Sequence, residues 1–156
     1  MIDPSRRTAL KTAGATGALA AAFAAGLLRP AAALAAWNKS AFEAKTTADA
    51  MKALGIANAA ESGDIQIRAP EIAENGAVVP IDITSSVPGT TSIAVFIEKN
   101  PFPFVGAFDV SQGALPYVHL RVKIGESSPV RVVVAAGGKY FTTVKEVKVT
   151  IGGCGG

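Results

Sequence analysis

Val118-His119-Leu120-Arg121-Val122-Lys123-Ile124 places apolar and basic side chains in strict alternation. A period of two predicts a β-strand with one buried face and one face toward solvent or a partner, because successive side chains leave a strand on opposite sides. The same alternation predicts further strands at residues 65–68, 79–84, 93–98 and 147–151.

Turn signals separate these runs. Glu74-Asn75-Gly76, Pro88-Gly89 and Gly137-Gly138 lie between neighbouring runs, and paired glycines tolerate the positive φ angles of a tight hairpin. Residues 130–136 are more continuously apolar, which favours a central strand. Several short strands at close spacing, with no helices between them, predict an all-β fold, an antiparallel β-sandwich of the immunoglobulin-like kind.

One short α-helix is expected before the strands. Ser40-Ala41-Phe42-Glu43 matches a capping box, in which the Ser and Glu side chains each bond a free backbone N–H. Small and apolar residues then recur at helical spacing as far as Met51, and Gly55 is a natural C-terminal stop. We interpret this helix as one that packs on the β domain.

The stretch between residues 100 and 116 is interpreted as irregular. Its prolines argue against a central strand, since proline cannot donate to a β ladder. Two roles are open for its aromatic residues: they cap the core, or they form an apolar patch that docks a second protein. The residues concerned are Phe102, Phe104 and Phe108.

The N-terminus has the features of an export signal. Arg6 and Arg7 precede residues 12–28, which are uncharged and rich in Ala and Gly, and Ala33-Leu34-Ala35 supplies small residues for cleavage. Paired arginines indicate the twin-arginine route. The alternative of a membrane anchor is disfavoured, because the run is Ala-rich and is cut by Arg29-Pro30.

Three segments follow from this interpretation. Residues 1–35 form a twin-arginine signal peptide, residues 36–151 form the helix plus the sandwich, and residues 152–156 form a flexible arm. The whole chain has 15 Lys and Arg against 12 Asp and Glu, but the excess lies in the signal. The exported chain is therefore close to neutral, and its charge gives no support for nucleic-acid binding.

Cys154 is the only cysteine, and it lies in Gly152-Gly153-Cys154-Gly155-Gly156. Four glycines make a thin, flexible tether that can carry the thiol into a narrow cleft of another protein. No Lys, Arg or His lies in the last eight residues, and the terminal carboxylate disfavours a thiolate. We therefore interpret Cys154 as an attachment point for sulfur-containing groups, activated inside a partner.

Other chemistry is not evident in the sequence. There is no G-x-S-x-G elbow, phosphate-binding P-loop or H-E-x-x-H motif. One histidine and one cysteine do not suffice for a Cys/His metal site, so we expect no metal and no cofactor. His119 is interpreted as a solvated strand residue, and Glu71 and Glu74 as solvated loop residues.

Three stretches resemble the SoxY family, the sulfur-carrier subunits of bacterial thiosulfate oxidation: residues 147–156, residues 69–80 and Ile97-Glu98-Lys99-Asn100-Pro101. The resemblance implies an immunoglobulin-like fold, a periplasmic location, a heterodimer with a SoxZ-type subunit and a carrier role without catalysis.

The resemblance also implies a reaction cycle on Cys154. A haem-containing enzyme attaches thiosulfate oxidatively, a hydrolase releases sulfate, and in some systems a molybdenum-haem dehydrogenase oxidises the remaining sulfane sulfur. The chain itself would hold no haem, metal or molybdenum. Because twin-arginine export moves folded cargo and no cofactor site is evident, we hypothesise that a partner without its own signal is exported with this chain.

Alternatives remain open at this point. One is a ubiquitin-like sulfur carrier activated at its terminal carboxylate, although here a cysteine interrupts the glycines. Another is an enzyme with Cys154 as its nucleophile. A third is an adhesion or structural module joined by a disulfide, and a disulfide-linked homodimer through Cys154 is also compatible with a carrier.

Overall fold

The computed structural model describes residues 38–150. The predicted signal peptide and the predicted arm, with Cys154 and its four glycines, lie outside these residues. Within residues 38–150, two short helices precede nine strands. The helices are α2 (Lys39–Glu43) and α3 (Thr47–Ala53), and the strands are β1 (Ala60–Glu61), β2 (Ile65–Arg68), β3 (Ile72–Ala73), β4 (Val79–Ser85), β5 (Thr90–Ile97), β6 (Phe104–Asp109), β7 (Tyr117–Val122), β8 (Ser128–Ala136) and β9 (Lys139–Val149).

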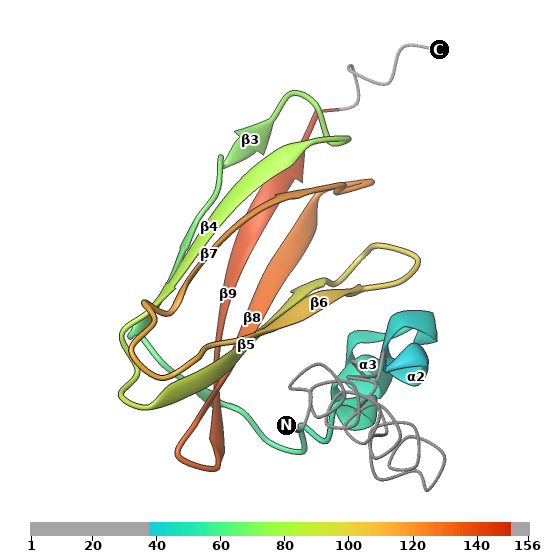
Figure 1. The fold of residues 1–156 in the computed structure, drawn as a ribbon. Coiled ribbons are helices and arrows are strands. Elements are labelled where there is room, and N and C mark those ends of the chain that lie inside the picture. Colours follow the sequence, from blue (N-terminus) through green and yellow to red (C-terminus); the bar gives the residue numbers. More distant parts are fainter. Residues whose placement is uncertain (1–37, 151–156) are drawn as a thin grey trace, which may run out of the picture. The chain divides into compact units, whose positions relative to one another are not determined.

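The strands form two sheets that pack face to face in an immunoglobulin-like sandwich, as the alternating pattern predicts (Figure 1). The larger sheet has the order β1-β9-β8-β5-β6, and β3 also pairs with β9. The smaller sheet has the order β2-β4-β7. Most neighbouring strands are antiparallel, and the exceptions are the parallel pairs that β1 and β3 make with β9.

An apolar core fills the space between the sheets. Val79, Ile81 and Ile83 of β4 are fully buried in it, opposite the inward side chains of β5 and β8. Each such side chain contributes about 1.5–3 kcal/mol when it leaves water, so this layer is the main force that holds the sheets together.

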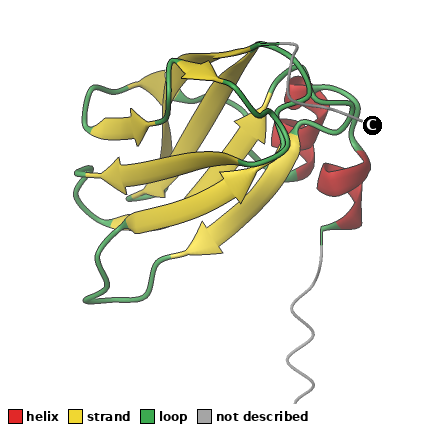
Figure 2. Ribbon diagram, turned by 90° about the horizontal axis from the view of Figure 1, so that it is seen from above, coloured by secondary structure: helices red, strands yellow, loops and turns green. Residues whose placement is uncertain are grey.

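The two central strands of the larger sheet, β5 and β8, are buried on both faces. Their second face meets α2 and α3 (Figure 2), where Phe96 and Val133 pack with Ala50 and Ile56. A strand covered on both sides is apolar at nearly every position rather than alternating. This explains the continuous apolar run at residues 130–136 and confirms the prediction of a central strand.

The sequence predicted one helix from Ser40, and the described residues form two helices there. Asn38 caps α2, with its Oδ1 accepting from the Ala41 N–H at 3.1 Å, and Thr46 caps α3, with its Oγ1 accepting from the Asp49 N–H at 3.1 Å. The capping box at Ser40 is therefore wrong, because Ser40 lies inside α2 and its hydroxyl donates to Asn38. In the part of the chain that the structure describes, no helix is long and apolar enough to cross a membrane.

Two predicted turns are confirmed. Gly55 ends α3 with a φ of 75°, and the following N–H of Ile56 donates to the Met51 carbonyl at 2.9 Å, as in a Schellman motif. Gly137 and Gly138 have φ angles of 56° and 74° and join β8 to β9 in a two-residue hairpin. Both positions need a positive φ, which glycine adopts without steric cost.

The stretch predicted as irregular contains a strand, β6. Its prolines precede the strand, and β6 lies at the edge of its sheet, where proline is tolerated. Phe104 begins the strand and is 6% exposed, and its ring centroid lies 4.6 Å from that of Phe42 and 5.4 Å from that of Phe96. Phe104 therefore caps the core beneath the helices, as one of the two proposed roles requires.

Candidate functional site

The structure describes the base from which the predicted cysteine arm starts. Thr150 is the last described residue, one position beyond the end of β9. Cys154, Gly152, Gly153, Gly155 and Gly156 lie outside the described residues. In the sequence, Cys154 follows Thr150 by four positions.

β3 holds the outer edge of β9 up to this point (Figure 1). The two strands are parallel, with Ile72 opposite Lys148. The Lys148 N–H donates to the Glu71 carbonyl at 2.9 Å, and the Thr150 N–H donates to the Ala73 carbonyl at 3.1 Å. The backbone is thus hydrogen-bonded as far as the last described residue.

The other side of β9 is held by the loop before β8. The β8–β9 ladder ends where Ser128 faces Val147, and beyond it the Val149 N–H donates to Ser127 Oγ at 2.9 Å. The hydroxyl takes the place of the next backbone acceptor. A side-chain oxygen that satisfies a backbone N–H in this way extends the anchored length of the strand.

Gly76 connects the β3 side of β9 to the loop that precedes β8. The Ile124 N–H donates to the Gly76 carbonyl at 2.7 Å. A Cβ atom at position 76 would lie 2.4 Å from the Ile124 carbonyl oxygen and 2.8 Å from Val149 Cγ1, so only glycine fits. We call residues 71–76 and 124–127, which hold the end of β9, the arm clamp.

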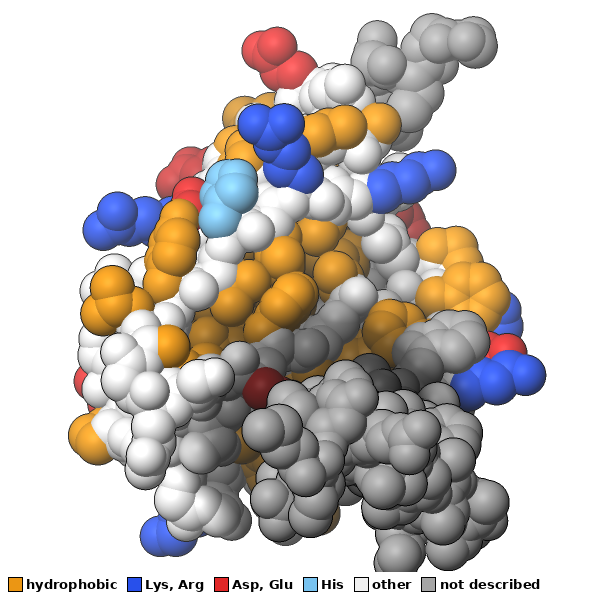
Figure 3. Space-filling view, viewed as in Figure 1, with side chains coloured by type: hydrophobic (Ala, Val, Ile, Leu, Met, Phe, Trp, Pro, Cys, Tyr) orange, Lys and Arg blue, Asp and Glu red, His pale blue; other side chains and the backbone are white. Residues whose placement is uncertain are grey.

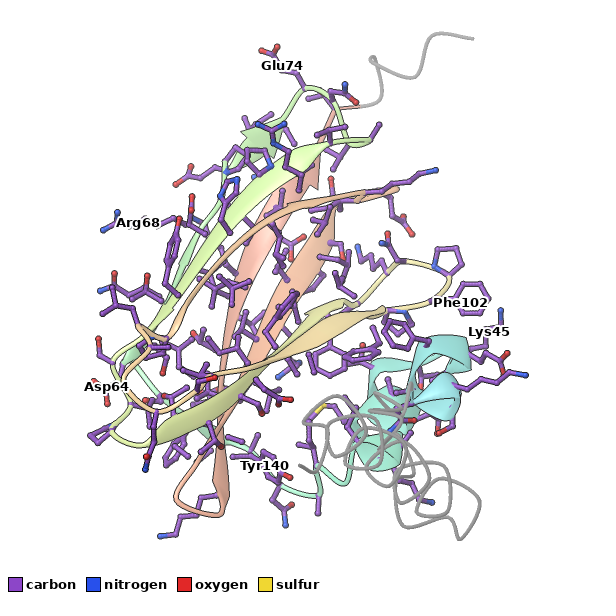
Figure 4. All side chains as sticks on the ribbon, in the orientation of Figure 1. Lys45, Asp64, Arg68, Glu74, Phe102 and Tyr140 are labelled. Carbon is purple, nitrogen blue, oxygen red and sulfur yellow. The ribbon has the colours of Figure 1, made fainter. Side chains whose placement is uncertain are left out.

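The surface around the arm clamp carries mixed charge. Glu71 and Glu74 are exposed, as predicted, and Figure 4 shows Glu74 pointing away from the domain. A groove of about 340 Å³ lies beside β3 and β9, lined by Glu71, Ile72, Lys145, Glu146 and Lys148. Ile72 is 58% exposed, an apolar side chain placed among these charges.

His119 lies on β7 and not at the arm clamp. Its ring is exposed, as predicted (Figure 3), and its Nδ1 lies 2.9 Å from Asp82 Oδ1 on the neighbouring strand β4. The Tyr117 hydroxyl donates to the same oxygen. This hydrogen bond, followed by that of His119, holds the pKa of Asp82 below its usual value, and it raises the pKa of Tyr117.

Sequence reasoning found His119 but missed its partners. Tyr117 and His119 share a face because they are two residues apart, and this could be read from the alternation. Asp82 is 37 residues from His119, and only the register of β4 with β7 places it directly opposite. Among residues 38–150, no group of three or more His, Cys, Asp or Glu side chains is placed to hold a metal ion.

A family model and one solved structure point to the same family. The family model described as "Sulfur oxidation protein SoxY" matches residues 50–154, a range that includes Cys154. The sulfur carrier protein SoxY from Chlorobium limicola f thiosulfatophilum is 47% identical, with a TM-score of 0.61, covering 67% of this chain and 96% of that one.

A superoxide reductase (neelaredoxin) from Ignicoccus hospitalis is also similar in structure, at 19% identity and a TM-score of 0.49, covering 67% of this chain and 93% of that one. The comparison with curated proteins gave no match.

Proposed function

The chain belongs to the SoxY family of sulfur oxidation proteins, and on that premise we propose that it is the periplasmic carrier that holds thiosulfate-derived intermediates on Cys154. SoxY proteins are sulfur carriers rather than enzymes. The observation that carries the proposal is the arm clamp, which anchors the chain at Thr150, four residues before the only cysteine. A fixed base and a glycine-flanked thiol together define a short radius within which the cargo can be presented.

The proposed cycle needs only the thiol from this chain. In loading, the Cys154 thiol and thiosulfate form an S–S bond, releasing one proton and two electrons, and a haem-containing partner enzyme accepts the electrons. In hydrolysis, water cleaves the bond between the sulfane sulfur and the sulfonate group, so that sulfate and a proton leave and a persulfide remains on Cys154. Where a dehydrogenase is present, it oxidises that remaining sulfur.

Activation of the thiol belongs to the partner enzymes. A free cysteine has a pKa of about 8.5, so only a small fraction is thiolate near neutral pH. The sequence around Cys154 has no basic residue, and the one histidine of the chain is hydrogen-bonded to Asp82 on β4. A thiol that is unreactive by itself and reactive inside a cleft is suited to carry a labile adduct between enzymes.

A SoxZ-type subunit is the proposed permanent partner, and the Sox enzymes are the proposed transient ones. We propose export by the twin-arginine route with residues 1–35 as the signal. The twin-arginine route moves folded cargo, so we infer that this chain assembles with its partner subunit before export.

Two cysteine variants test the carrier role. Cys154→Ser should abolish loading of labelled thiosulfate and leave the partner complex intact in size-exclusion chromatography. The double variant Cys154→Ser with Thr150→Cys keeps one thiol but moves it to the anchored end of β9, and it should also fail to load. Loading of the double variant at the rate of the original chain would show that the reach of the arm is irrelevant.

A further inference from the structure

The edge of β7 is open. This six-residue strand pairs with β4 on one side and has no neighbour on the other among the residues that the structure describes. The other sheet edges are shorter or interrupted: β1 and β3 pair with β9 at residues 141–142 and 148–149, β2 has only four residues, and the β5–β6 register shifts so that Val105 of β6 is an extra residue. Short strands and bulges are the usual ways in which proteins prevent unwanted edge pairing, and β7 has neither.

The burial of side chains points to a missing neighbour. Ile81 and Ile83 of β4 are fully buried, whereas Val118 and Leu120 of β7, which face the same core, are only partly buried. A groove of about 420 Å³ opens at this edge, between β6 and β7. Figure 3 shows this face as a hollow with hydrophobic side chains exposed in it, and its lining includes Phe108, Val110, Leu115, Tyr117, Val118 and Leu120.

Backbone groups of β7 point toward this opening. The Ser85 N–H donates to the Pro116 carbonyl at 2.9 Å, and this bond shows which opposite residues of the β4–β7 ladder are hydrogen-bonded to each other. In an antiparallel pair, hydrogen-bonded and non-hydrogen-bonded positions alternate. Val118 and Leu120 therefore bond to β4, and the N–H and C=O groups of His119 and Arg121 face the free edge.

The outer face of this edge is basic. His119, Arg121 and Lys123 follow one another at alternate positions and are all exposed, and Arg68 lies on the same face of the sheet. The carboxylate of Asp82 already accepts from Tyr117 and contacts His119. A strand added here would meet apolar side chains on its inner face and cationic side chains on its outer face.

We propose that the partner subunit adds one strand to the free edge of β7, with apolar side chains toward Val118 and Leu120 and acidic side chains beside Arg121 and Lys123. The added strand closes the groove, and its backbone bonds the free groups of His119 and Arg121. A second copy of this chain is a poorer occupant, because it would bring two basic rows onto one face. The identity of the partner as the SoxZ-type subunit rests on the proposed function, whereas the surface rests on the geometry alone.

Cross-linking of the co-expressed complex tests the surface. A photoreactive phenylalanine analogue at Leu115, which is 85% exposed in the groove, should yield a product with the combined mass of this chain and the SoxZ-type subunit. The matched control is the same analogue at Val144, which is 45% exposed on β9 and should give no such product. On forming the complex, hydrogen exchange at the His119 and Arg121 amides should slow by about tenfold or more.

Charge reversal tests the chemistry of the partner strand. Arg121→Glu should weaken the complex by about tenfold or more, while Lys139→Glu, at the β8–β9 hairpin, should stay within about twofold of the original affinity. Circular dichroism of both variants checks that the fold is kept.

Each of the other outcomes would contradict one part of the proposal, either the partner or the surface. If the unaltered chain forms no complex with the SoxZ-type subunit, the partner named under the proposed function is wrong, and so is the occupant. If the complex forms but cross-links from Val144 and not from Leu115, or if Arg121→Glu binds normally, the surface is wrong. A product of twice the mass of this chain from Leu115 would show that a second copy supplies the strand.

Discussion

Replacing Gly76 with alanine should loosen the arm clamp and destabilise the domain. The new Cβ would lie 2.4 Å from the Ile124 carbonyl oxygen, a backbone atom, and 2.8 Å from Val149 Cγ1. Comfortable contacts between such atoms are about 3.5–4.0 Å, so the two backbones must separate. That movement strains the 2.7 Å hydrogen bond from the Ile124 N–H to Gly76.

The expected size follows from these two effects. Overpacking in a close contact costs about 1–3 kcal/mol, and a weakened hydrogen bond adds about 0.5–1.5 kcal/mol. We therefore expect Gly76→Ala to lower the free energy of unfolding by about 1.5–4.5 kcal/mol. The matched control is Gly63→Ala, whose Cβ would have no heavy atom within 4 Å, and it should change stability by less than about 1 kcal/mol.

Equilibrium unfolding in urea measures both variants, and hydrogen exchange locates the effect. The Ile124 and Thr150 amides should exchange faster in Gly76→Ala than in the original chain, because both are bonded within the arm clamp. A free energy of unfolding within about 0.5 kcal/mol of the original chain would refute the claim that Gly76 holds the two sides of the arm clamp together.

Three further predictions follow. Phe104→Ala should lower the free energy of unfolding, measured in urea, by about 3–5 kcal/mol, because its buried ring packs on Phe42 and Phe96. Phe102→Ala, at a position 48% exposed, should lower it by less than about 1 kcal/mol. Equal losses would contradict the assignment of Phe104 to the core. The pKa of Asp82 is lowered in the folded state, so its contribution to the free energy of unfolding is present above its ordinary pKa of 3.8 and is lost as the pH falls through the lower value of the folded state. Asp82→Asn should therefore flatten the acid limb of a plot of the unfolding temperature against pH. An unchanged acid limb would count against the Tyr117 and His119 bonds. Replacing Arg6 and Arg7 with lysine should retain both this chain and its partner subunit in the cytoplasm in a cell-fractionation assay, and normal export of the partner would rule out co-export.

The fold could be predicted largely from alternation, and the errors have local causes. β4 and β7 were evident because each has one face toward the core and one exposed face, so the period of two is clean. β1 and β3 have two residues each, too few to show any period, and they exist because β9 offers an edge to pair with. β6 was hidden by the prolines before it, which exclude a central strand but permit one at an edge.

The single helix expected from the sequence is two helices, because two capping residues each begin a helix and the apolar spacing did not reveal the break between them. Asn38 and Thr46 are both good capping residues, and each begins its own helix, whereas Ser40 matched the capping box by spacing alone. Between the two helices, Ala44 adopts an extended conformation. Helical spacing of apolar residues continues across such a break, because both helices pack their small side chains on the same sheet face.

The candidate site divides into a part that the sequence reveals and a part that it does not. Cys154 and its glycines form a local motif, so no structure is needed to single them out. The arm clamp depends on contacts between segments far apart in the chain: Gly76 meets Ile124, and Ser127 bonds Val149. Long-range register decides such contacts, and a single sequence does not contain it in readable form.

The most direct test of the carrier role is the intact mass of the protein isolated from thiosulfate-grown cells, with the modified residue mapped. We expect additions of thiosulfate-derived sulfur that a thiol reductant removes and that map to Cys154 alone. An unmodified chain under these conditions, or adducts on any other residue, would contradict it.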